Sequence, residues 1–497
     1  MLLRSNDPKD DMNEVRFVDT TLRDGQQSLW ALSMKTGMML PVAEQMDRAG
    51  FDAIELMASS HFKKCVRELK DDPWERIRLV AQRIKKTPLR MSAGRINAFE
   101  ITPLSVYSLF LERMAANGLR QARISEEWND ISGWQRKVTL SRKAGLEPII
   151  NLIFSVSPKH SDDYYARKTR EAVSLGVARL CLKDPGGLLT PERTRTLVPL
   201  ILQNSRTTPL EFHTHCTTGL GPLCCLEAIK LGARTVNTAI PPLADASSNP
   251  SLFNVAKNAR VLGYQTMIDE EVLRPVSEHF TFIARREGFP IGVPVEYDYA
   301  QYLHQVPGGM ISNLRHQLRL MGMEDRLAQT LLEASRVRAE FGYPIMVTPL
   351  SQFVGSQAAI NVILGERYKE VTDQVIQYAL GLWGKEGADT MDPNVKDKIL
   401  GRPRARELAR WEPPEPSIRE IRSKMGGAGV TDEELLLRWA LRKEDIEAMR
   451  VAGPPKEYIS ARHPLVTLVH ELTKRKDYHR IQVQKPGMSL ILEKRQL

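Results

Sequence analysis

The chain has 497 residues, a formal net charge of +10 and a hydrophobic fraction of 42%. It is too long for one ordinary domain, and its composition is typical of a globular protein with an ample core. Its basic residues are scattered among many Asp and Glu residues, which argues against a nucleic-acid-binding protein. Segment 1–14 is polar and no later stretch is apolar enough to cross a bilayer, so we predict a cytoplasmic protein without a transmembrane segment. The five cysteines lack metal-ribbon spacing, and we expect reduced thiols.

Short apolar segments alternate with helical patterns from the N-terminus to about residue 260. They lie at Val15–Leu22, Phe51–Met57, Leu89–Ala93, Gln121–Ile124, Glu147–Ile153, Ala178–Leu182, Leu210–His215 and Thr235–Ile240. Parallel strands need helical crossovers, and a closed barrel leaves no sheet edge. The pattern therefore predicts an α/β fold, a (β/α)8 TIM barrel, whose chemistry sits at the carboxyl ends of the strands.

Beyond about Lys257 the pattern changes to long amphipathic helices, and the proline-rich stretch Gly401–Pro416 is typical of a linker. From Gly453 onward nine Lys or Arg residues face four Asp or Glu residues, around a possible small hairpin at Pro486-Gly487. That tail is a candidate docking surface for an acidic partner, although a solvated basic tail is the simpler interpretation. We predict a barrel domain, a helical C-terminal domain and a basic tail, at residues 15–300, 301–450 and 451–497.

Two imidazoles, His213 and His215, lie two residues apart on a predicted strand, so both point to the same side of the sheet. A lone His-x-His pair is a weak signal. Asp24, at the end of the first strand, adds an anionic oxygen. Ligands of Asp/His/His type fit Zn²⁺, Mn²⁺ or a related ion that keeps a position open for substrate.

Lys183 follows the sixth strand and does not fit a metal site in its ordinary state, because an ammonium group has no lone pair. It would have to be deprotonated, carboxylated by CO₂ to a carbamate, or present as a counter-ion. The simplest alternative is an ion pair with the neighbouring Asp184.

Three strings carry a resemblance to a known family: Asp-Thr-Thr-Leu-Arg-Asp-Gly-Gln-Gln-Ser at 19–28, Leu-Lys-Asp-Pro-Gly-Gly at 182–187 and His-Thr-His at 213–215. They resemble the carboxyltransferase domain of biotin-dependent enzymes, which include pyruvate carboxylase, the oxaloacetate decarboxylase α subunit and the pyruvate-side subunit of transcarboxylase. Similar strings occur at residues 71–76, 304–310 and 347–358. The last two separate the chain from lyases and synthases of the wider superfamily.

The resemblance implies a site and a reaction. Asp24, Lys183, His213 and His215 would hold a divalent metal (zinc, manganese or cobalt), with Lys183 carboxylated. Arg23 and Gln27 would face the substrate. Ser247 stands where the family has a threonine that shuttles a proton to and from biotin. Carboxyl transfer to a 2-oxo acid passes through an enolate, whose oxygen needs a Lewis acid and a cation. The catalytic residues would be Arg23, Gln27, Lys183 and Ser247.

Four positions depart from the family pattern. The arginine that grips the pyruvate carboxylate is replaced by Gly94, an active-site aspartate by Lys63, a substrate-contacting tyrosine by Ile101, and the aspartate after His-Thr-His by Cys216. Lys63 or Arg95 could supply the missing positive charge and bind the substrate. These departures put pyruvate in doubt as the acceptor.

No biotin attachment sequence lies near the C-terminus, so any biotin must come from another polypeptide. The leading hypothesis is a metal-dependent carboxyltransferase or decarboxylase subunit that acts on a 2-oxo acid or related enolisable substrate, a small carboxylic acid or thioester. Separate biotin carrier and biotin carboxylase subunits would be its partners. One alternative is a biotin-independent, metal-dependent barrel carboxylase, decarboxylase or lyase, and another is a non-catalytic subunit that pairs with an active homologue. The resemblance implies a homodimer or hetero-oligomer.

Overall fold

The computed structural model describes residues 13–97, 100–458, 468–469, 472, 480–485 and 488–493. Eight parallel strands close into a barrel in the order β2-β3-β4-β5-β6-β7-β8-β1, because β1 pairs with both β8 and β2. A two-residue strand, β9, adds to β1 outside the ring. The strands are β1 (Glu14–Asp19), β2 (Ala53–Ala58), β3 (Leu89–Ala93), β4 (Gln121–Ile124), β5 (Glu147–Ile153), β6 (Arg179–Asp184), β7 (Leu210–Thr214), β8 (Thr235–Thr238) and β9 (Gln265–Thr266).

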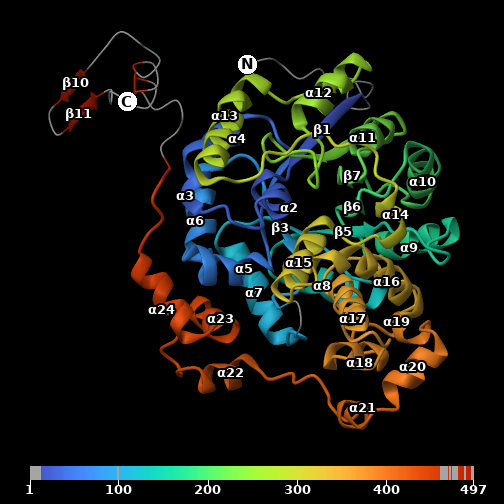
Figure 1. The fold of residues 1–497 in the computed structure, drawn as a ribbon. Coiled ribbons are helices and arrows are strands. Elements are labelled where there is room, and N and C mark those ends of the chain that lie inside the picture. Colours follow the sequence, from blue (N-terminus) through green and yellow to red (C-terminus); the bar gives the residue numbers. More distant parts are fainter. Residues whose placement is uncertain are drawn as a thin grey trace.

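Helices follow each strand and surround the barrel (Figure 1). In the barrel region they are η1 (Thr21–Gly25), α2 (Gln26–Leu29), α3 (Thr36–Met39), η2 (Leu40–Val42), α4 (Ala43–Arg48), α5 (His61–Lys64), η3 (Cys65–Leu69), α6 (Pro73–Arg83), α7 (Leu104–Ala116), α8 (Ile131–Lys143), α9 (Asp162–Ser174), α10 (Pro191–Asn204), α11 (Gly221–Lys230), α12 (Leu252–Val261) and α13 (Glu270–Glu287). The predicted (β/α)8 barrel is confirmed, and each predicted segment overlaps one of β1–β8.

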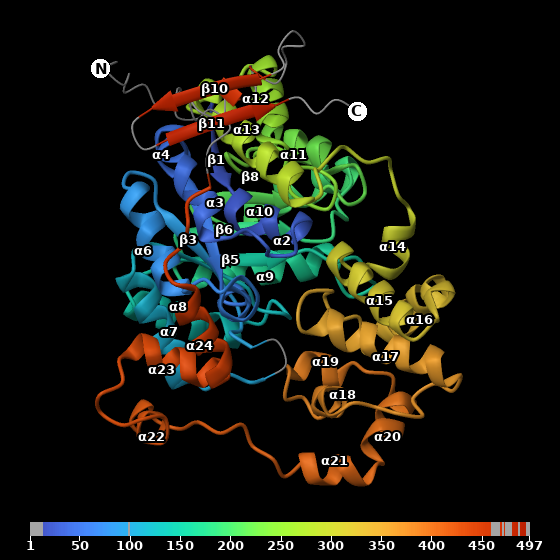
Figure 2. The same cartoon turned by 60° about the vertical axis from the view of Figure 1, so that its left-hand side comes forward.

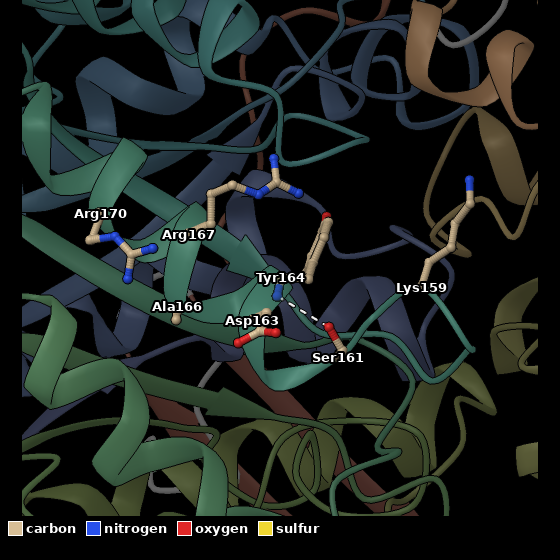
Figure 3. A pocket seen from close by; sticks show the side chains of 7 residues that line it. All are labelled: Lys159, Ser161, Asp163, Tyr164, Ala166, Arg167 and Arg170. Carbon is tan, nitrogen blue, oxygen red and sulfur yellow. Dashed lines mark hydrogen bonds between the residues drawn. The ribbon is translucent and has the colours of Figure 1, made fainter.

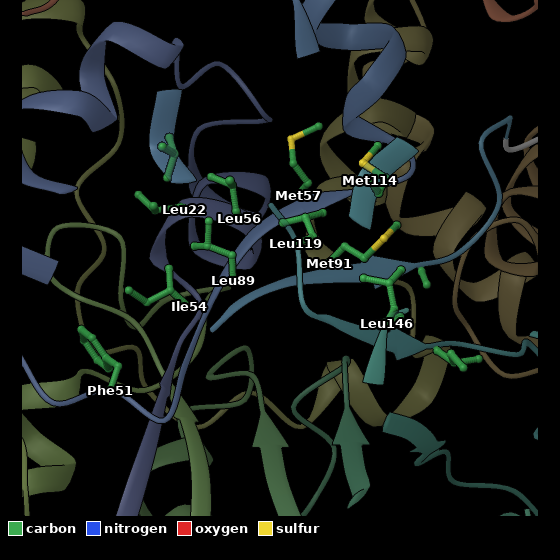
Figure 4. Packing of buried hydrophobic residues seen from close by; sticks show 14 of the residues in the cluster. Leu22, Phe51, Ile54, Leu56, Met57, Leu89, Met91, Met114, Leu119 and Leu146 are labelled. Carbon is green, nitrogen blue, oxygen red and sulfur yellow. The ribbon is translucent and has the colours of Figure 1, made fainter. Parts of the chain in front are cut away.

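The hydrophobic core of the barrel region lies between the strands and their covering helices. Figure 4 shows Leu89 and Met91 of β3 packed with Met114 of α7 and with Leu119. These positions are almost fully buried. The apolar strand residues are thus held between sheet and helices, as expected for parallel strands that are covered on their outer face.

The first strand differs from its prediction. Val15–Leu22 was expected to be extended throughout, but β1 ends at Asp19 and residues Thr21–Gly25 form one turn of π-helix. A π-helical turn at a strand end is uncommon and is frequent at functional sites. Here it carries Arg23 and Asp24 over the mouth of the barrel.

A second, helical region follows the barrel and has its own core, formed by residues such as Phe341, Phe353 and Trp383. It comprises α14 (Ala300–His304), α15 (Gly308–Leu320), η4 (Glu324–Arg326), α16 (Leu327–Glu340), α17 (Leu350–Leu364), α18 (Asp373–Ala379), α19 (Lys385–Asp389), α20 (Pro393–Leu400) and α21 (Pro403–Leu408). The stretch Gly401–Pro416 was expected to be a linker, but its first half is helical because Pro403 occupies the first position of α21.

Three further helices return to the barrel: α22 (Ile418–Lys424), α23 (Asp432–Ala440) and α24 (Lys443–Ala452). Their buried residues, including Leu436 and Met449, belong to the barrel core. Of these helices, α23 packs against α7 and α24 against η3 and α23 (Figure 2). Residues 418–452 therefore share a core with the barrel and not with α14–α21. The domain limits 15–300, 301–450 and 451–497 stay predictions.

In the C-terminal tail β10 (Arg480–Lys485) and β11 (Met488–Glu493) pair antiparallel, as expected for the small hairpin predicted there. Most of the rest of the tail, and the polar segment 1–12, lie outside the described residues. All five cysteines are buried and free. In the described part of the chain, every helix is too short or too polar to cross a membrane.

Candidate active site

The predicted metal ligands lie at the carboxyl ends of three barrel strands, β1, β6 and β7. Asp24 lies in the π-turn after β1, Lys183 on β6 and His213 on β7. Lys183 and His213 are register partners in the sheet, so they point to the same face at the same height. The adjacent loop approaches closely because Gly187 has φ +63°, and a Cβ there would stand 2.7 Å from the His215 carbonyl oxygen.

Three potential ligand atoms converge at this site. Asp24 Oδ2 lies 3.2 Å from His213 Nε2 and 3.5 Å from His215 Nε2. All three side chains are buried, and within the described residues they form the one cluster of this kind.

Contacts at the far side of each ring bear on the tautomers of the two histidines. His215 Nδ1 lies 2.7 Å from the Ser247 carbonyl oxygen, which can only accept, so Nδ1 carries the proton. His213 Nδ1 lies 2.8 Å from Asn237 Oδ1, and Asn249 Nδ2 donates to His213 Nε2 at 3.3 Å. His215 Nε2 therefore turns a lone pair toward the Asp24 carboxylate. His213 Nε2 does the same when its Nδ1 donates to Asn237, and not when Nδ1 accepts from Arg123 Nη1, which lies 3.0 Å away.

The protonation states agree with a cation site. Burial opposes ionisation of Asp24, but Arg23 beside it holds the pKa of Asp24 well below its usual range. Burial and the charge of Arg123 lower the pKa of His213 to about 3. Since His213 is neutral, its contact with Asp24 is not an ion pair. An anionic oxygen and imidazole lone pairs that face one another fit a divalent metal.

A buried network of charges supports this site from below. Glu55 Oε2 accepts from Arg23 Nε at 2.8 Å, and Glu55 Oε1 lies 2.7 Å from Arg123 Nε. Arg123 Nη1 donates to Asn237 Oδ1 at 2.7 Å. Arg23 also donates to Asp24 Oδ2 at 2.9 Å. Because these charges are buried and paired, the guanidinium of Arg23 is held in one position next to the candidate ligands.

Lys183 is buried among positive neighbours. Burial and the charges of Arg123 and Arg23 lower its pKa to about 8. Asp184 accepts from the amides of Leu188 and Leu189 and from Thr214 Oγ1. Those bonds turn the Asp184 carboxylate toward its own loop, so the contacts described for it do not include an ion pair with Lys183.

A cavity of about 490 Å³ opens above the candidate ligands and is roofed by the helical region. Its lining residues are Arg23, Asp24, Gln27, Ser28, Leu32, Ala58, Ser59, Ser60, Ser92, Gly94, Arg95, Ser125, Glu127, Ile153, Lys183, Pro185, His215, Thr217, Ser247, Pro307, Met310, Met346, Val347, Thr348, Ser351 and Gln352. Gln27 is exposed into it, whereas its neighbour Gln26 is buried and bonded to Leu22. Ser247 Oγ donates to the Ser28 carbonyl at 3.0 Å.

Only some of the positions that depart from the family pattern lie at the cavity. Gly94 and Arg95 line the cavity, and a Cβ at Gly94 would meet no described atom within 4 Å. Lys63, Ile101 and Cys216 are not among the described lining residues. Of the two cations predicted to bind substrate, the structure brings Arg95 to the cavity and leaves Lys63 outside its lining.

A second hollow, of about 420 Å³, lies at the start of α9 on the outer surface (Figure 3). Its lining residues are Lys159, Ser161, Asp163, Tyr164, Ala166, Arg167 and Arg170. Ser161 caps α9 by accepting from the Tyr164 amide. None of the predicted site residues lies there.

Comparison with known proteins gives the family. Residues 14–279 match the HMGL-like family and residues 302–460 match the conserved carboxylase domain. A pyruvate carboxylase subunit of Methanocaldococcus jannaschii is 36% identical over 391 residues, which cover 78% of this chain and 68% of that protein. The chain belongs to the pyruvate carboxylase-like carboxyltransferase family. It is therefore an enzyme of the carboxylase/carboxyltransferase class.

Other members of this family are similar over most of the chain. The methylmalonyl-CoA carboxyltransferase 5S subunit of Propionibacterium freudenreichii is 30% identical, with 85% of each chain covered. The 2-oxoglutarate carboxylase large subunit of Hydrogenobacter thermophilus is 31% identical over 85% of this chain and 66% of that protein. The carboxyl transferase domain of Rhizobium etli pyruvate carboxylase, solved with pyruvate, superposes with a TM-score of 0.80, covering 97% of this chain and 84% of that chain at 22% identity. The resemblance in fold is confirmed.

Sequence reasoning missed the residues that support the site: Glu55, Arg123, Asn237 and Glu127. Glu55 and Arg123 are charged residues inside short strands, Ala-Ile-Glu-Leu-Met-Ala and Gln-Ala-Arg-Ile. Such strands are expected to be buried on both faces. A charged side chain in such a strand must be paired with an opposite charge. The charges of Glu55 and Arg123 within apolar strands were therefore the feature from which buried ion pairs could have been predicted.

Proposed function

We propose that this chain transfers a carboxyl group between biotin, carried on a separate polypeptide, and a 2-oxo acid or related enolisable substrate. The proposal rests on one observation above the others: Asp24 Oδ2 and the Nε2 atoms of His213 and His215 converge beside Arg23 in a cavity. A divalent cation held there would supply a Lewis acid for the negative charge that develops on the substrate oxygen.

Arg23 would stabilise the same charge. It is fixed by Glu55 and Asp24, so it costs little reorganisation when the oxyanion forms. Gln27, exposed into the cavity, would hydrogen-bond to the substrate.

Lys183 is proposed to be carboxylated on Nζ. Burial lowers its pKa to about 8, so a larger part of the side chain is the free amine that adds CO₂. The resulting carbamate is an oxygen anion, which removes the objection that an ammonium group cannot bind a cation.

Ser247 is proposed to move the proton. Its Oγ donates to the Ser28 carbonyl, so its lone pairs remain available to accept. In the carboxylation direction, the substrate carbon next to the oxo group loses a proton and forms a new bond to CO₂ released from carboxybiotin. The biotin nitrogen that loses its carboxyl group gains the proton through Ser247.

Separate biotin carrier and biotin carboxylase subunits are proposed as partners. Relatives named as subunits of larger enzymes support this, among them two pyruvate carboxylase subunits and the 2-oxoglutarate carboxylase large subunit. Arg95 lines the cavity and is the cation proposed to bind a carboxylate of the substrate other than the one next to the oxo group. Lys63 remains a weaker candidate for that contact, because it lies outside the described lining.

The test compares two histidine variants for metal content and for biotin-dependent carboxyl transfer. His213→Ala should lose both, because it removes a candidate ligand. His279→Ala is the matched control: it is also a buried histidine, but its Nε2 bonds to the Met38 carbonyl away from the cavity. Full transfer by metal-free His213→Ala would overturn the proposal. Transfer that needs no biotin would favour the biotin-independent alternative.

A further inference from the structure

Arg95 and Glu127 enter the cavity from the side opposite the two histidines of the candidate metal site. They follow β3 and β4, whereas His213 and His215 lie at the end of β7, and the sheet order puts β3 and β7 four strands apart on either path round the ring. Eight strands about 4.8 Å apart and tilted by about 36° enclose a ring about 15 Å across. A ligand that touches both sides therefore needs a polar group at each end.

The guanidinium of Arg95 is held on two sides. Its Nε donates to Glu127 Oε1 at 2.9 Å, and its Cζ lies 4.7 Å from the ring centroid of Trp383. Trp383 belongs to the helical region, is 3% exposed and is fixed by a bond from Trp128 Nε1 to its carbonyl oxygen. Nε is occupied and one face is stacked, whereas the two Nη atoms have no hydrogen-bond partner among the described residues. Their edge can therefore bind a carboxylate.

Glu127 is well suited to hold Arg95 in place. It is 7% exposed, and although burial opposes its ionisation, Lys137 and Arg95 hold the pKa of Glu127 below its usual value. The group is therefore an anion that Arg95 neutralises. The space beside the pair is unobstructed, since Gly94 presents no side chain.

Resting on the proposed function, we infer that the substrate is a 2-oxo acid with a second, distal carboxylate. Arg95 binds that carboxylate through its Nη edge, and Glu127 and Trp383 are positioning residues that hold Arg95. The 2-oxo end then lies at Asp24, His215 and Arg23, and the carbon chain crosses the cavity between them.

The experiment measures ligand binding to the metal-loaded full chain by calorimetry, without carboxyl transfer. The probes are 2-oxoglutarate and 2-oxopentanoate, which have equal chain length but differ in whether the far end is a carboxylate or a methyl group. We expect 2-oxoglutarate to bind at least about tenfold more tightly, the range of one charge-assisted hydrogen-bonded pair. Arg95→Gln should bring the two affinities within about twofold, with 2-oxopentanoate binding unchanged.

Two further variants separate positioning from general damage. Glu127→Ala should lower the preference for 2-oxoglutarate while metal content and 2-oxopentanoate binding stay at the wild-type level. Arg286→Gln is the control, because Arg286 also stacks on an aromatic ring, that of Tyr458 at 5.1 Å, and lies beside Glu287 but outside the cavity. It should leave the preference unchanged.

Equal affinity of the wild type for the two acids would overturn the inference, as would a preference that survives in Arg95→Gln. If the wild type binds the two acids equally and transfers a carboxyl group to pyruvate, the inference is wrong and the proposed function is still supported. If the wild type prefers 2-oxoglutarate as expected but shows no biotin-dependent transfer, the proposed function is wrong and Arg95 is still a carboxylate-binding residue.

Discussion

Asn237→Ala should weaken metal binding although Asn237 is not a ligand. Its Oδ1 accepts from His213 Nδ1 at 2.8 Å, and Arg123 Nη1 lies 3.0 Å from the same nitrogen. Once the Asn237 acceptor is removed, Arg123 is the neighbour left at Nδ1. Because arginine can only donate, His213 would move its proton to Nε2 and lose the lone pair that faces Asp24.

Loss of a partner that orients a ligating histidine typically costs about 10–100-fold in metal affinity, or about 1.4–2.8 kcal/mol. The affinity is measured by competition with a chromophoric chelator. Asn151→Ala is the matched control, since Asn151 is also fully buried on a barrel strand but bonds to Ser125 and not to a histidine. Wild-type metal affinity in Asn237→Ala would refute the tautomer argument. If both variants bind metal equally weakly, the loss comes from a less stable fold and not from the tautomer of His213.

Three other predictions follow from single contacts. Ser247→Ala should keep its metal, because His215 bonds to the backbone carbonyl of Ser247, but should abolish biotin-linked transfer; normal turnover would remove the proton-shuttle role. Lys183→Ala should regain part of its activity with bicarbonate or a small carboxylate, while Lys183→Arg should not; no rescue at any concentration would count against a carbamate. Burial and the charge of Glu127 raise the pKa of Glu126 to about 7. Because the folded protein holds this proton more tightly than the unfolded chain, the free energy of unfolding falls as the pH rises from about 4.5 to about 7. Glu126→Gln removes this loss, so it should stabilise the fold by about 1–3 kcal/mol more at pH 8 than at pH 5, as measured by thermal unfolding. An equal effect at both pH values would contradict that assignment.

Local pattern was enough to predict the barrel. Strands such as Leu89–Ala93, Gln121–Ile124 and Glu147–Ile153 lie where short segments with apolar residues are followed by helical patterns. The ligand pair His213 and His215 could also be predicted, since the two-residue period of a strand alone puts both on one side. Their convergence with Asp24 follows from barrel closure, which brings β1 beside β8.

The supporting residues could not be predicted in the same way. Asn237 and Arg123 contact His213 although they are 24 and 90 residues away in the sequence. The local sequence of either strand does not indicate that its partner is His213. The contact of Arg95 with Trp383 joins the barrel to a helical region whose placement depends on tertiary packing. The early end of β1 was missed because the π-helical turn that carries Arg23 and Asp24 has no apolar periodicity of its own.

The central claim is metal-dependent carboxyl transfer with biotin on another polypeptide. It is tested most directly by isolating the native protein from its own cells and combining a streptavidin blot with elemental analysis of the same sample. The account predicts one divalent metal ion per chain and a stoichiometric biotinylated partner. A metal-free chain that is still active in carboxyl transfer would contradict it, and a metal-loaded chain without any biotinylated partner would contradict the role of biotin.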